Sequence, residues 1–236
     1  PRNERGSCVA KRVVIFDAYG TLFDVAAAAR HAAAQPGREA LAAKEAELSR
    51  IWREKQIGYS WWRTVTGTYV SFWEVTEQAL DHALSATGLA GDPDLRRALL
   101  DLYRELSAYP EVAGVLSDLR SAGRLCAILS NGSPDMLEAA IRAAGLCNAL
   151  DRVLSAHSVA TFKPSGKVYD LVEAELGTPR DEVLFVSSNG WDVAAAAGYG
   201  FHTVWVNRTG LPPEELPFGP AHETADLTAI PSLAAA

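Results

Sequence analysis

The sequence predicts an α/β protein whose core is a doubly wound parallel sheet, with a helical cap domain inserted into it. Two observations predict this class. From residue 133 onward, short apolar runs rich in β-branched residues alternate with helix-like stretches, which is typical of parallel strands joined by helices. Between the first apolar run and about residue 110, long stretches rich in Ala, Leu and Glu indicate inserted helices instead. We therefore expect a Rossmann-like core that carries a cap.

Strands are expected where β-branched and other apolar residues run together between turn-forming residues. They are VVIF at 13–16, LCAIL at 125–129, RVLS at 152–155, VLFV at 183–186 and HTVWV at 202–206. A helix is expected at 111–123, leading into the second strand. Two more are expected at 135–145, after a Ser-Pro start, and at 166–177, because each of these stretches ends in a glycine, Gly145 or Gly177.

The inserted helices are expected at 38–56 and 70–88. Tyr109 and Pro110 mark the return to the sheet domain, because the residue before a proline disfavours helix. The Pro-rich segment 208–223 is expected to be an irregular loop. The expected domains are a catalytic core of residues 12–24 and 110–236 and a cap of residues 25–109.

Length and composition limit the classes of function. A chain of 236 residues with 48% hydrophobic and 22% charged residues can form a folded core and a smaller inserted domain. The formal net charge of −7 opposes broad binding to nucleic-acid phosphates, which needs clustered Lys and Arg. The polar start PRNERGSCVAKR has no signal-peptide core, and no apolar run reaches about 18 residues. We therefore expect a cytoplasmic protein that binds neither nucleic acid nor membranes.

Several common site types are not expected. Cys8, Cys126 and Cys147 are odd in number and form no C-x-x-C pair, which argues against a disulfide framework or a zinc cluster. The five histidines show no metal-ligand spacing, and the chain has neither a G-x-S-x-G motif nor a P-loop. A serine triad and a metalloprotease site are therefore not expected.

Polar side chains follow the predicted strands, where an open α/β sheet binds its ligands. They are Asp17 after the first strand, Ser130 and Asn131 after the second, Lys163 after the third, and Ser187, Ser188, Asn189 and Asp192 after the fourth. Taken singly, each is explained as a helix cap, a turn residue or a solvated lysine. Together they supply a carboxylate, a cation, hydroxyls and amides at one rim, which is a set suited to hydrolysis.

Four segments resemble the motifs of a known family. They are FDAYGTLFD (16–24), LSNGSPDML (129–137), FKPSGKVYD (162–170) and FVSSNGWD (185–192). These segments are similar to the four motifs of the haloacid dehalogenase superfamily, and the resemblance covers nearly the whole chain. The forms DAYGTLFD and SSNGWD, with IWREKQIGYSWW (51–62) in the cap, resemble the L-2-haloacid dehalogenase branch.

Two positions favour a dehalogenase over a phosphatase of the same superfamily. The phosphatases carry a second Asp two residues after the nucleophile and further acids in the fourth motif that hold Mg²⁺, whereas this chain has Tyr19 and Ser187-Ser188-Asn189 there. Without a metal ion, attack by a carboxylate on a phosphoryl group lacks charge compensation, while attack on a carbon–halogen bond needs only a site for the departing halide. We therefore expect no metal and no cofactor.

The resemblance implies a reaction in two steps. Asp17 displaces halide from the 2-carbon of a small (S)-2-haloacid with inversion and forms an ester, and water then attacks the Asp17 carbonyl to release the (R)-2-hydroxy acid. Lys163 is expected to keep Asp17 ionised, because a nearby opposite charge favours the charged form. Arg53 matches the family's halide-accepting arginine, and Asn131 is expected to donate to the halide or to the substrate.

The remaining residues receive supporting roles by the same resemblance. Asn189 and Asp192 are expected to position and activate the water, with Thr21 and Ser187 holding Asp17 and Lys163, and with Tyr169 orienting a carboxylate. Ser130 and the backbone amides after residues 17 and 130, including that of Ala18, are expected to bind the substrate carboxylate. Tyr19, Ile57, Phe72 and Trp191 resemble the apolar pocket for the alkyl group.

Two alternatives remain open at this stage. A phosphatase acting on a small ester is the first, and activity retained in excess EDTA would exclude it. A small-anion binder that keeps the fold without turnover is the second, and halide release would exclude it. The family's cap helices often dimerise, so we also expect a homodimer.

Overall fold

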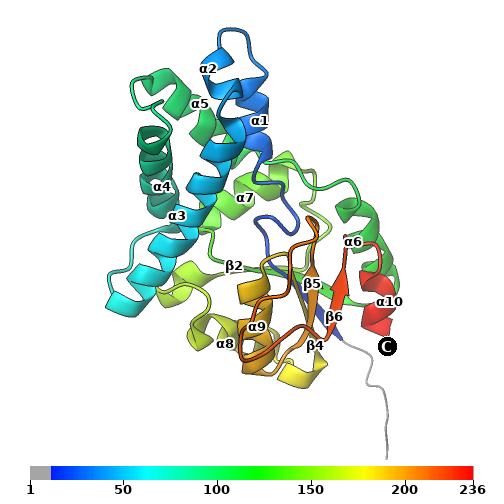
Figure 1. The fold of residues 1–236 in the computed structure, drawn as a ribbon. Helices are drawn as coiled ribbons and strands as arrows, with labels where there is room; N and C mark the ends of the chain where they lie inside the picture. Colours follow the sequence, from blue (N-terminus) through cyan, green and yellow to red (C-terminus); the bar gives the residue numbers. More distant parts are fainter. Residues whose placement is uncertain (1–11, 236) are drawn as a thin grey trace, which may run out of the picture.

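The computed structural model describes residues 12–235, and Cys8 lies outside them. Six parallel strands form one sheet in the order β3-β2-β1-β4-β5-β6 (Figure 1). The strands are β1 (Val13–Phe16), β2 (Leu125–Ser130), β3 (Arg152–Ser155), β4 (Val183–Ser187), β5 (His202–Val206) and β6 (His222–Thr224). The predicted α/β class and parallel sheet are confirmed.

The sheet is buried on both faces, which explains why its central strands are almost wholly apolar. Alternate residues of β1 enter two separate apolar clusters: Val14 and Phe16 belong to one, and Val13 and Ile15 belong to the other. The helices that pack on the sheet are α6 (Val112–Ser121), α7 (Pro134–Ala143), α8 (Gly166–Leu176), α9 (Gly190–Tyr199) and α10 (Ile230–Ala235). Buried residues of α6, α7 and α10 join the first cluster, and those of α8 and α9 join the second.

The strand order reverses at β1, which pairs with β2 on one side and β4 on the other. Phe16, its last residue, lies opposite Ile128 of β2 and Val186 of β4. Such a reversal opens a crevice beyond the carboxyl ends of the strands. The polar residues that follow β1, β2 and β4 are therefore brought to one place.

Of the six helices between β1 and β2, the first five form a body of their own (Figure 1). They are α1 (Ala27–Ala33), α2 (Glu39–Ala42), α3 (Glu45–Thr66), α4 (Phe72–Ala86) and α5 (Pro93–Arg104). The chain enters and leaves this body side by side, because Asp24 N donates to Ser107 O at 3.0 Å and Tyr109 N donates to Leu22 O at 3.0 Å. We propose that the core of residues 12–24 and 110–236 meets the cap of residues 25–109 at this crossing.

Two local expectations need adjustment. The stretch 38–56 is not one helix, because a turn at Ala43 and Lys44 separates α2 from α3, which continues as far as Thr66. The expected irregular loop is confirmed over residues 208–221, and the edge strand β6 follows it, held by parallel pairing with β5 rather than by an apolar run. Within residues 12–235, no helix is long and apolar enough to cross a membrane.

Candidate active site

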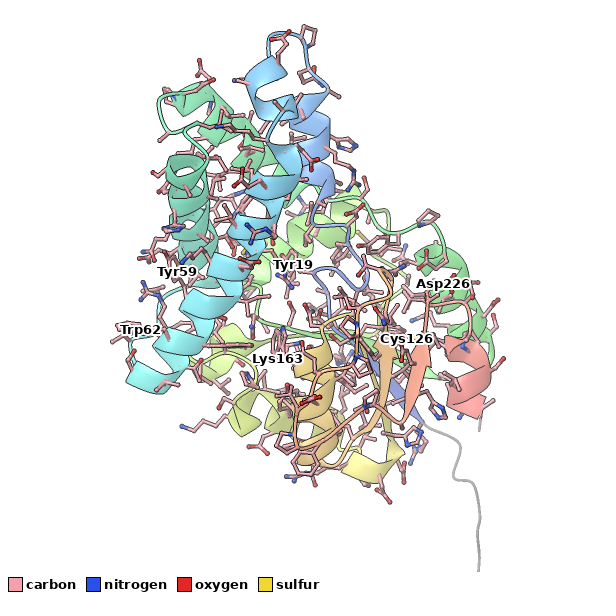
Figure 2. The ribbon with its side chains drawn as sticks, in the orientation of Figure 1. Tyr19, Tyr59, Trp62, Cys126, Lys163 and Asp226 are labelled. Atoms are coloured by element: carbon pink, nitrogen blue, oxygen red, sulfur yellow. The ribbon has the colours of Figure 1, made fainter. Side chains whose placement is uncertain are left out.

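The polar residues predicted at the strand ends lie together beyond the carboxyl ends of the strands. Asp17 directly follows β1, and its backbone N–H donates to Val186 O of β4 at 2.9 Å. Lys163 comes from the segment after β3, and Asn189 and Asp192 come from the start of α9. Figure 2 shows Tyr19 and Lys163 in the region where the helical body meets the sheet. The site therefore lies at the meeting of cap and core.

Asp17 is a buried carboxylate with both oxygens held. Its Oδ1 accepts from Lys163 Nζ at 2.9 Å. Its Oδ2 accepts from Thr21 Oγ1 at 3.0 Å and from Asn189 Nδ2 at 3.0 Å. Its side chain is 8% exposed, so the protein rather than bulk water sets its orientation. A carboxylate fixed in this way is pre-oriented for attack on a small substrate.

Lys163 lies between two carboxylates. Its buried ammonium donates to Asp17 Oδ1 at 2.9 Å, to Asp192 Oδ2 at 2.6 Å and to Leu129 O at 3.1 Å, which uses all three donors. Burial lowers the pKa of Lys163, but the charges of Asp17 and Asp192 outweigh burial and raise that pKa above its usual value. The two carboxylates therefore favour the charged form of Lys163.

Asp192 is fully buried and accepts three hydrogen bonds. Tyr169 OH donates to its Oδ1 at 2.7 Å, while Lys163 Nζ and Ser187 Oγ donate to its Oδ2 at 2.6 Å and 3.2 Å. Burial raises the pKa of Asp192 above its usual value, and Lys163 opposes that rise. Burial also raises the pKa of Tyr169 well above its usual value, so its hydroxyl keeps its proton and donates.

Hydroxyl groups fix the two loops that carry Asp17 and Asn189. Thr21 Oγ1 accepts from the backbone N–H of Ser188 at 2.8 Å while it contacts Asp17. Ser187 Oγ accepts from the backbone N–H of Asn189 at 3.1 Å while it contacts Asp192. Each hydroxyl therefore links a buried carboxylate, Asp17 or Asp192, to the β4–α9 turn.

Arg53 reaches the site from α3 of the cap. Its Nη2 donates to Tyr19 O at 3.1 Å and to Asn189 Oδ1 at 3.2 Å, and its Nη1 donates to Gln56 Oε1 at 2.8 Å. Asn189 thus contacts Arg53 through its oxygen and Asp17 through its nitrogen. A guanidinium from the cap and a carboxylate from the core are linked by a single amide.

Aromatic rings form the wall between cap and core. Tyr19 stacks on Tyr103 of α5 at 5.7 Å between ring centroids and lies 6.1 Å from Phe72 of α4. Trp191 meets Trp61 of α3 edge to face at 5.3 Å. Ile57, one helical turn after Arg53, is half-buried on α3. The predicted apolar residues therefore belong to the same cap–core boundary as Arg53.

The residues expected to bind a carboxylate also have structural contacts. Ser130 Oγ accepts from Gly132 N at 3.1 Å, and Asn131 Oδ1 accepts from Lys163 N at 2.8 Å. Ala18 O accepts from the backbone N–H groups of the turn that follows it, including Thr21 N at 3.3 Å. Asn131 thus uses its oxygen within the protein, which leaves its Nδ2 as the end suited to a ligand.

The family model for haloacid dehalogenase-like hydrolases matches residues 11–200 of the chain. The chain belongs to this family. Within the family it is 44% identical over 223 residues to (S)-2-haloacid dehalogenase 1 of Pseudomonas sp. (strain CBS-3), covering 94% of the chain and 96% of that relative. It is 44% identical to (S)-2-haloacid dehalogenase 4A of Burkholderia cepacia, covering 86% of each. The resemblance to the L-2-haloacid dehalogenases is confirmed.

Two solved structures of dehalogenases share the fold of this haloacid dehalogenase-like hydrolase. One is a dehalogenase with an intermediate complex, with a TM-score of 0.91 and 41% identity over 96% of the chain and 98% of that structure. The other is the L-2-haloacid dehalogenase of Xanthobacter autotrophicus with chloropropionic acid covalently bound. It has a TM-score of 0.83 and 37% identity over 94% of the chain and 97% of that structure.

Other residues of this hydrolase contact the predicted site residues without having been given a role. Ser188, which the sequence placed among the polar residues after the fourth strand, contacts Thr21. Gln56 contacts Arg53, while Thr76 and Tyr103 contact Gln56. These cap residues gave no sequence signal, because only the packing of α3, α4 and α5 brings them together.

The residues around Asp17 do not resemble a site for a bound metal ion. Among residues 12–235, no group of three or more His, Cys, Asp or Glu side chains is arranged to hold one. The ammonium of Lys163 lies between the Asp17 and Asp192 carboxylates and supplies positive charge there.

Proposed function

We propose that the chain hydrolyses small (S)-2-haloalkanoic acids to (R)-2-hydroxyalkanoic acids and halide, through an ester of Asp17. The observation that carries this proposal is the Asp17 carboxylate, which Lys163, Thr21 and Asn189 hold beside the Arg53 guanidinium. The relative with covalently bound chloropropionic acid supports it, because a covalent adduct is what a carboxylate nucleophile forms.

In the first step, an Asp17 oxygen forms a bond to the 2-carbon while the carbon–halogen bond breaks. The halide leaves with the bonding electron pair, and the centre inverts. Arg53 donates to the departing halide, since its Nη2 lies 3.2 Å from the amide that also holds Asp17. Proximity of this kind contributes up to about 7–11 kcal/mol to catalysis.

In the second step, water attacks the ester carbonyl carbon of Asp17, and the bond from that carbon to the oxygen held by the 2-carbon breaks. Asn189 and Asp192 position the water, Asp192 takes up one of its protons and passes it to the departing oxygen, which becomes the product hydroxyl. The second proton of the water goes to solvent as Asp17 returns to a carboxylate. Burial raises the pKa of Asp192, so its carboxylate accepts a proton more readily than the carboxylate of an exposed aspartate does. Ser187 and Tyr169 hold Asp192 in place during the transfer.

Substrate recognition uses the rest of the predicted set. Ser130, Asn131 and the backbone amide of Ala18 bind the substrate carboxylate, and Lys163 balances its charge. Tyr19, Phe72, Ile57 and Trp191 surround the alkyl group. The half-buried to buried state of these apolar side chains supports a pocket for a short chain.

Assembly and location of the protein remain predictions. Trp62 and Val65 of α3 are 63% and 86% exposed, and association of two cap helices would bury such side chains. The exposed Trp62 and Val65 are consistent with the homodimer that we propose from the resemblance to the family. A cytoplasmic location rests on the sequence alone.

We expect oxygen labelling and stereochemistry to identify the covalent route together. In a single turnover with excess enzyme in H₂¹⁸O, an (S)-2-haloacid should give an (R)-2-hydroxy acid whose hydroxyl carries ¹⁶O from Asp17, because water reaches only the ester carbonyl. Mass spectrometry of product and protein measures both labels. Excess EDTA, as a parallel condition, should leave halide release unchanged.

The competing route is direct attack by water with Asp17 or Asp192 as general base. This route also inverts the 2-carbon, but it puts ¹⁸O into the first-turnover product. Fully labelled first product would therefore overturn the covalent role of Asp17 even if inversion is observed. Loss of halide release in EDTA would show that the reaction needs a metal ion.

We expect Arg53→Ala to slow halide formation more than it affects folding. A hydrogen bond from a charged donor contributes about 1.5–3 kcal/mol, and Arg53 is the only guanidinium within residues 12–235 that contacts Asn189. Arg53→Lys should restore only part of the rate, because an ammonium lacks the planar fork. An unchanged single-turnover rate in Arg53→Ala would place the halide site elsewhere.

A further inference from the structure

The Arg53 guanidinium is held by neutral acceptors. Its three acceptors are the backbone oxygen of Tyr19, the amide oxygen of Asn189 and the amide oxygen of Gln56. In the described part of the chain, no ion pair includes Arg53, whereas its neighbour Arg50 pairs with Glu54. The positive charge beside Asp17 is therefore fixed in direction without being neutralised, which is the condition under which it attracts an anion most strongly.

Gln56 is the acceptor from the cap, and its amide has one defined orientation. Thr76 Oγ1 donates its only proton to Phe72 O at 2.7 Å. It can therefore only accept from Gln56 Nε2, which lies 2.7 Å away. With its nitrogen directed at Thr76 and, at 3.0 Å, at Tyr103 OH, the amide presents Oε1 to Arg53. The reverse orientation would place Gln56 Nε2 against the Arg53 donor and Gln56 Oε1 against the Thr76 oxygen, which has no proton left to donate.

The contacts of Gln56 join three helices of the cap. Gln56 and Arg53 lie three residues apart on one face of α3, Thr76 belongs to α4, and Tyr103 belongs to α5. Gln56 is 1% exposed and Thr76 is fully buried, so neither contact is replaced by bulk water. Tyr103 also stacks on Tyr19, which follows the nucleophile by two residues. The packing of the cap thus determines where the guanidinium points.

We propose that Gln56 is a positioning residue of the halide site, which orients Arg53 toward the departing halide while leaving its charge intact. This inference rests on the proposed role of Arg53 as halide acceptor. Burying a polar side chain on a cap helix lowers the stability of the fold unless each of its polar atoms has a hydrogen-bond partner. Its chemistry is also specific: a glutamate has the same shape but would pair with Arg53 and compete with the halide.

The test compares leaving groups. Single-turnover halide formation is measured with (S)-2-chloropropionate and (S)-2-iodopropionate for the wild type, Gln56→Met and Gln56→Glu, together with inhibition by added chloride. We expect both variants to slow the chloride reaction by about tenfold or more and the iodide reaction less, because chloride depends more on hydrogen-bond donors. Inhibition by chloride should weaken in parallel, and Gln56→Glu should be no milder than Gln56→Met.

Gln78→Met is the matched control. Gln78 also accepts from a cap arginine, Arg63 Nη2 at 2.8 Å, but it contacts none of the proposed catalytic residues. The Gln78→Met variant should release chloride and iodide at the wild-type rates, so the ratio of the two rates should also equal that of the wild type. Thermal unfolding of each variant shows whether the fold is kept at the assay temperature.

Equal slowing of both leaving groups by the Gln56 variants, with unchanged chloride inhibition, would overturn the inference and leave Gln56 a packing residue. Arg53→Ala in the same assay separates this failure from that of the proposed function. If Arg53→Ala shows no leaving-group dependence, the halide role of Arg53 fails. If Arg53→Ala slows the chloride reaction more than the iodide reaction and the Gln56 variants do not, only the role of Gln56 fails.

Discussion

Replacing Asp17 with Asn is expected to abolish dehalogenation while the protein still folds. An amide is too weak a nucleophile to displace a halide, so the ester cannot form. The fold survives because Asn has the shape of Asp and because Lys163 keeps its ion pair with Asp192. Halide release and thermal unfolding measure the two effects, with turnover below a tenth of the wild-type rate as the expected result.

Asp24→Asn provides the control for this substitution. Asp24 lies in the same segment, but its carboxylate binds Arg30 and the backbone N–H of Ala26 rather than the site. It should retain the wild-type rate. Turnover above a tenth of wild type in Asp17→Asn, with the asparagine verified intact by mass spectrometry, would remove Asp17 as the nucleophile.

The sequence could predict that Asp17, Lys163 and Asp192 lie close together, because a parallel sheet brings segments that are far apart in the chain to the same edge. Strand ends can be located from apolar runs, and parallel strands bring those ends to one edge. The pairing of Phe16 with Ile128 and with Val186 then leaves the residues after each strand as neighbours. No side-chain detail was needed for that prediction.

The contacts of Gln56 could not be predicted in the same way. On α3, Gln56 lies in the run REKQ, which is polar enough to suit a solvated helix face, and only the approach of α4 and α5 buries it. Strand β6 escaped prediction for a related reason. Its residues His222–Thr224 have little strand propensity of their own, and pairing with β5 supplies the hydrogen bonds.

Replacing Lys163 with Met is expected to destabilise the protein strongly near neutral pH. Removing one partner of a buried ion pair costs about 3–5 kcal/mol, because the remaining charge is left without compensation. In the wild type, the pKa of Lys163 is raised above the usual 10.5, so its charge stabilises the folded protein at neutral pH. That stabilisation is lost only as pH rises through the raised pKa, and the ion pairs of Lys163 are therefore intact at pH 7. Urea unfolding at pH 7 measures the loss.

The variant should also show a changed dependence of stability on pH. Burial raises the pKa of Asp192 in the folded protein, and Lys163 is what opposes that rise. Without Lys163, the folded state favours the protonated acid more strongly. The stabilisation that protonation gives is fully present below the unfolded pKa and is lost as pH rises through the folded pKa. The Met variant should therefore lose stability, relative to the wild type, as pH rises from acid to neutral.

A second substitution shows whether the loss in Lys163→Met comes from charge or from packing. Asp192→Asn removes the carboxylate that lies 2.6 Å from the ammonium and is fully buried. In the wild type this change breaks an ion pair and should destabilise. In Lys163→Met it removes an uncompensated buried charge, so we expect it to recover stability, with a coupling free energy of about 1–3 kcal/mol. Equal effects of Asp192→Asn in both backgrounds would show that the two side chains do not interact through charge, and Lys163 would then be a packing residue with no part in holding Asp17 and Asp192 together.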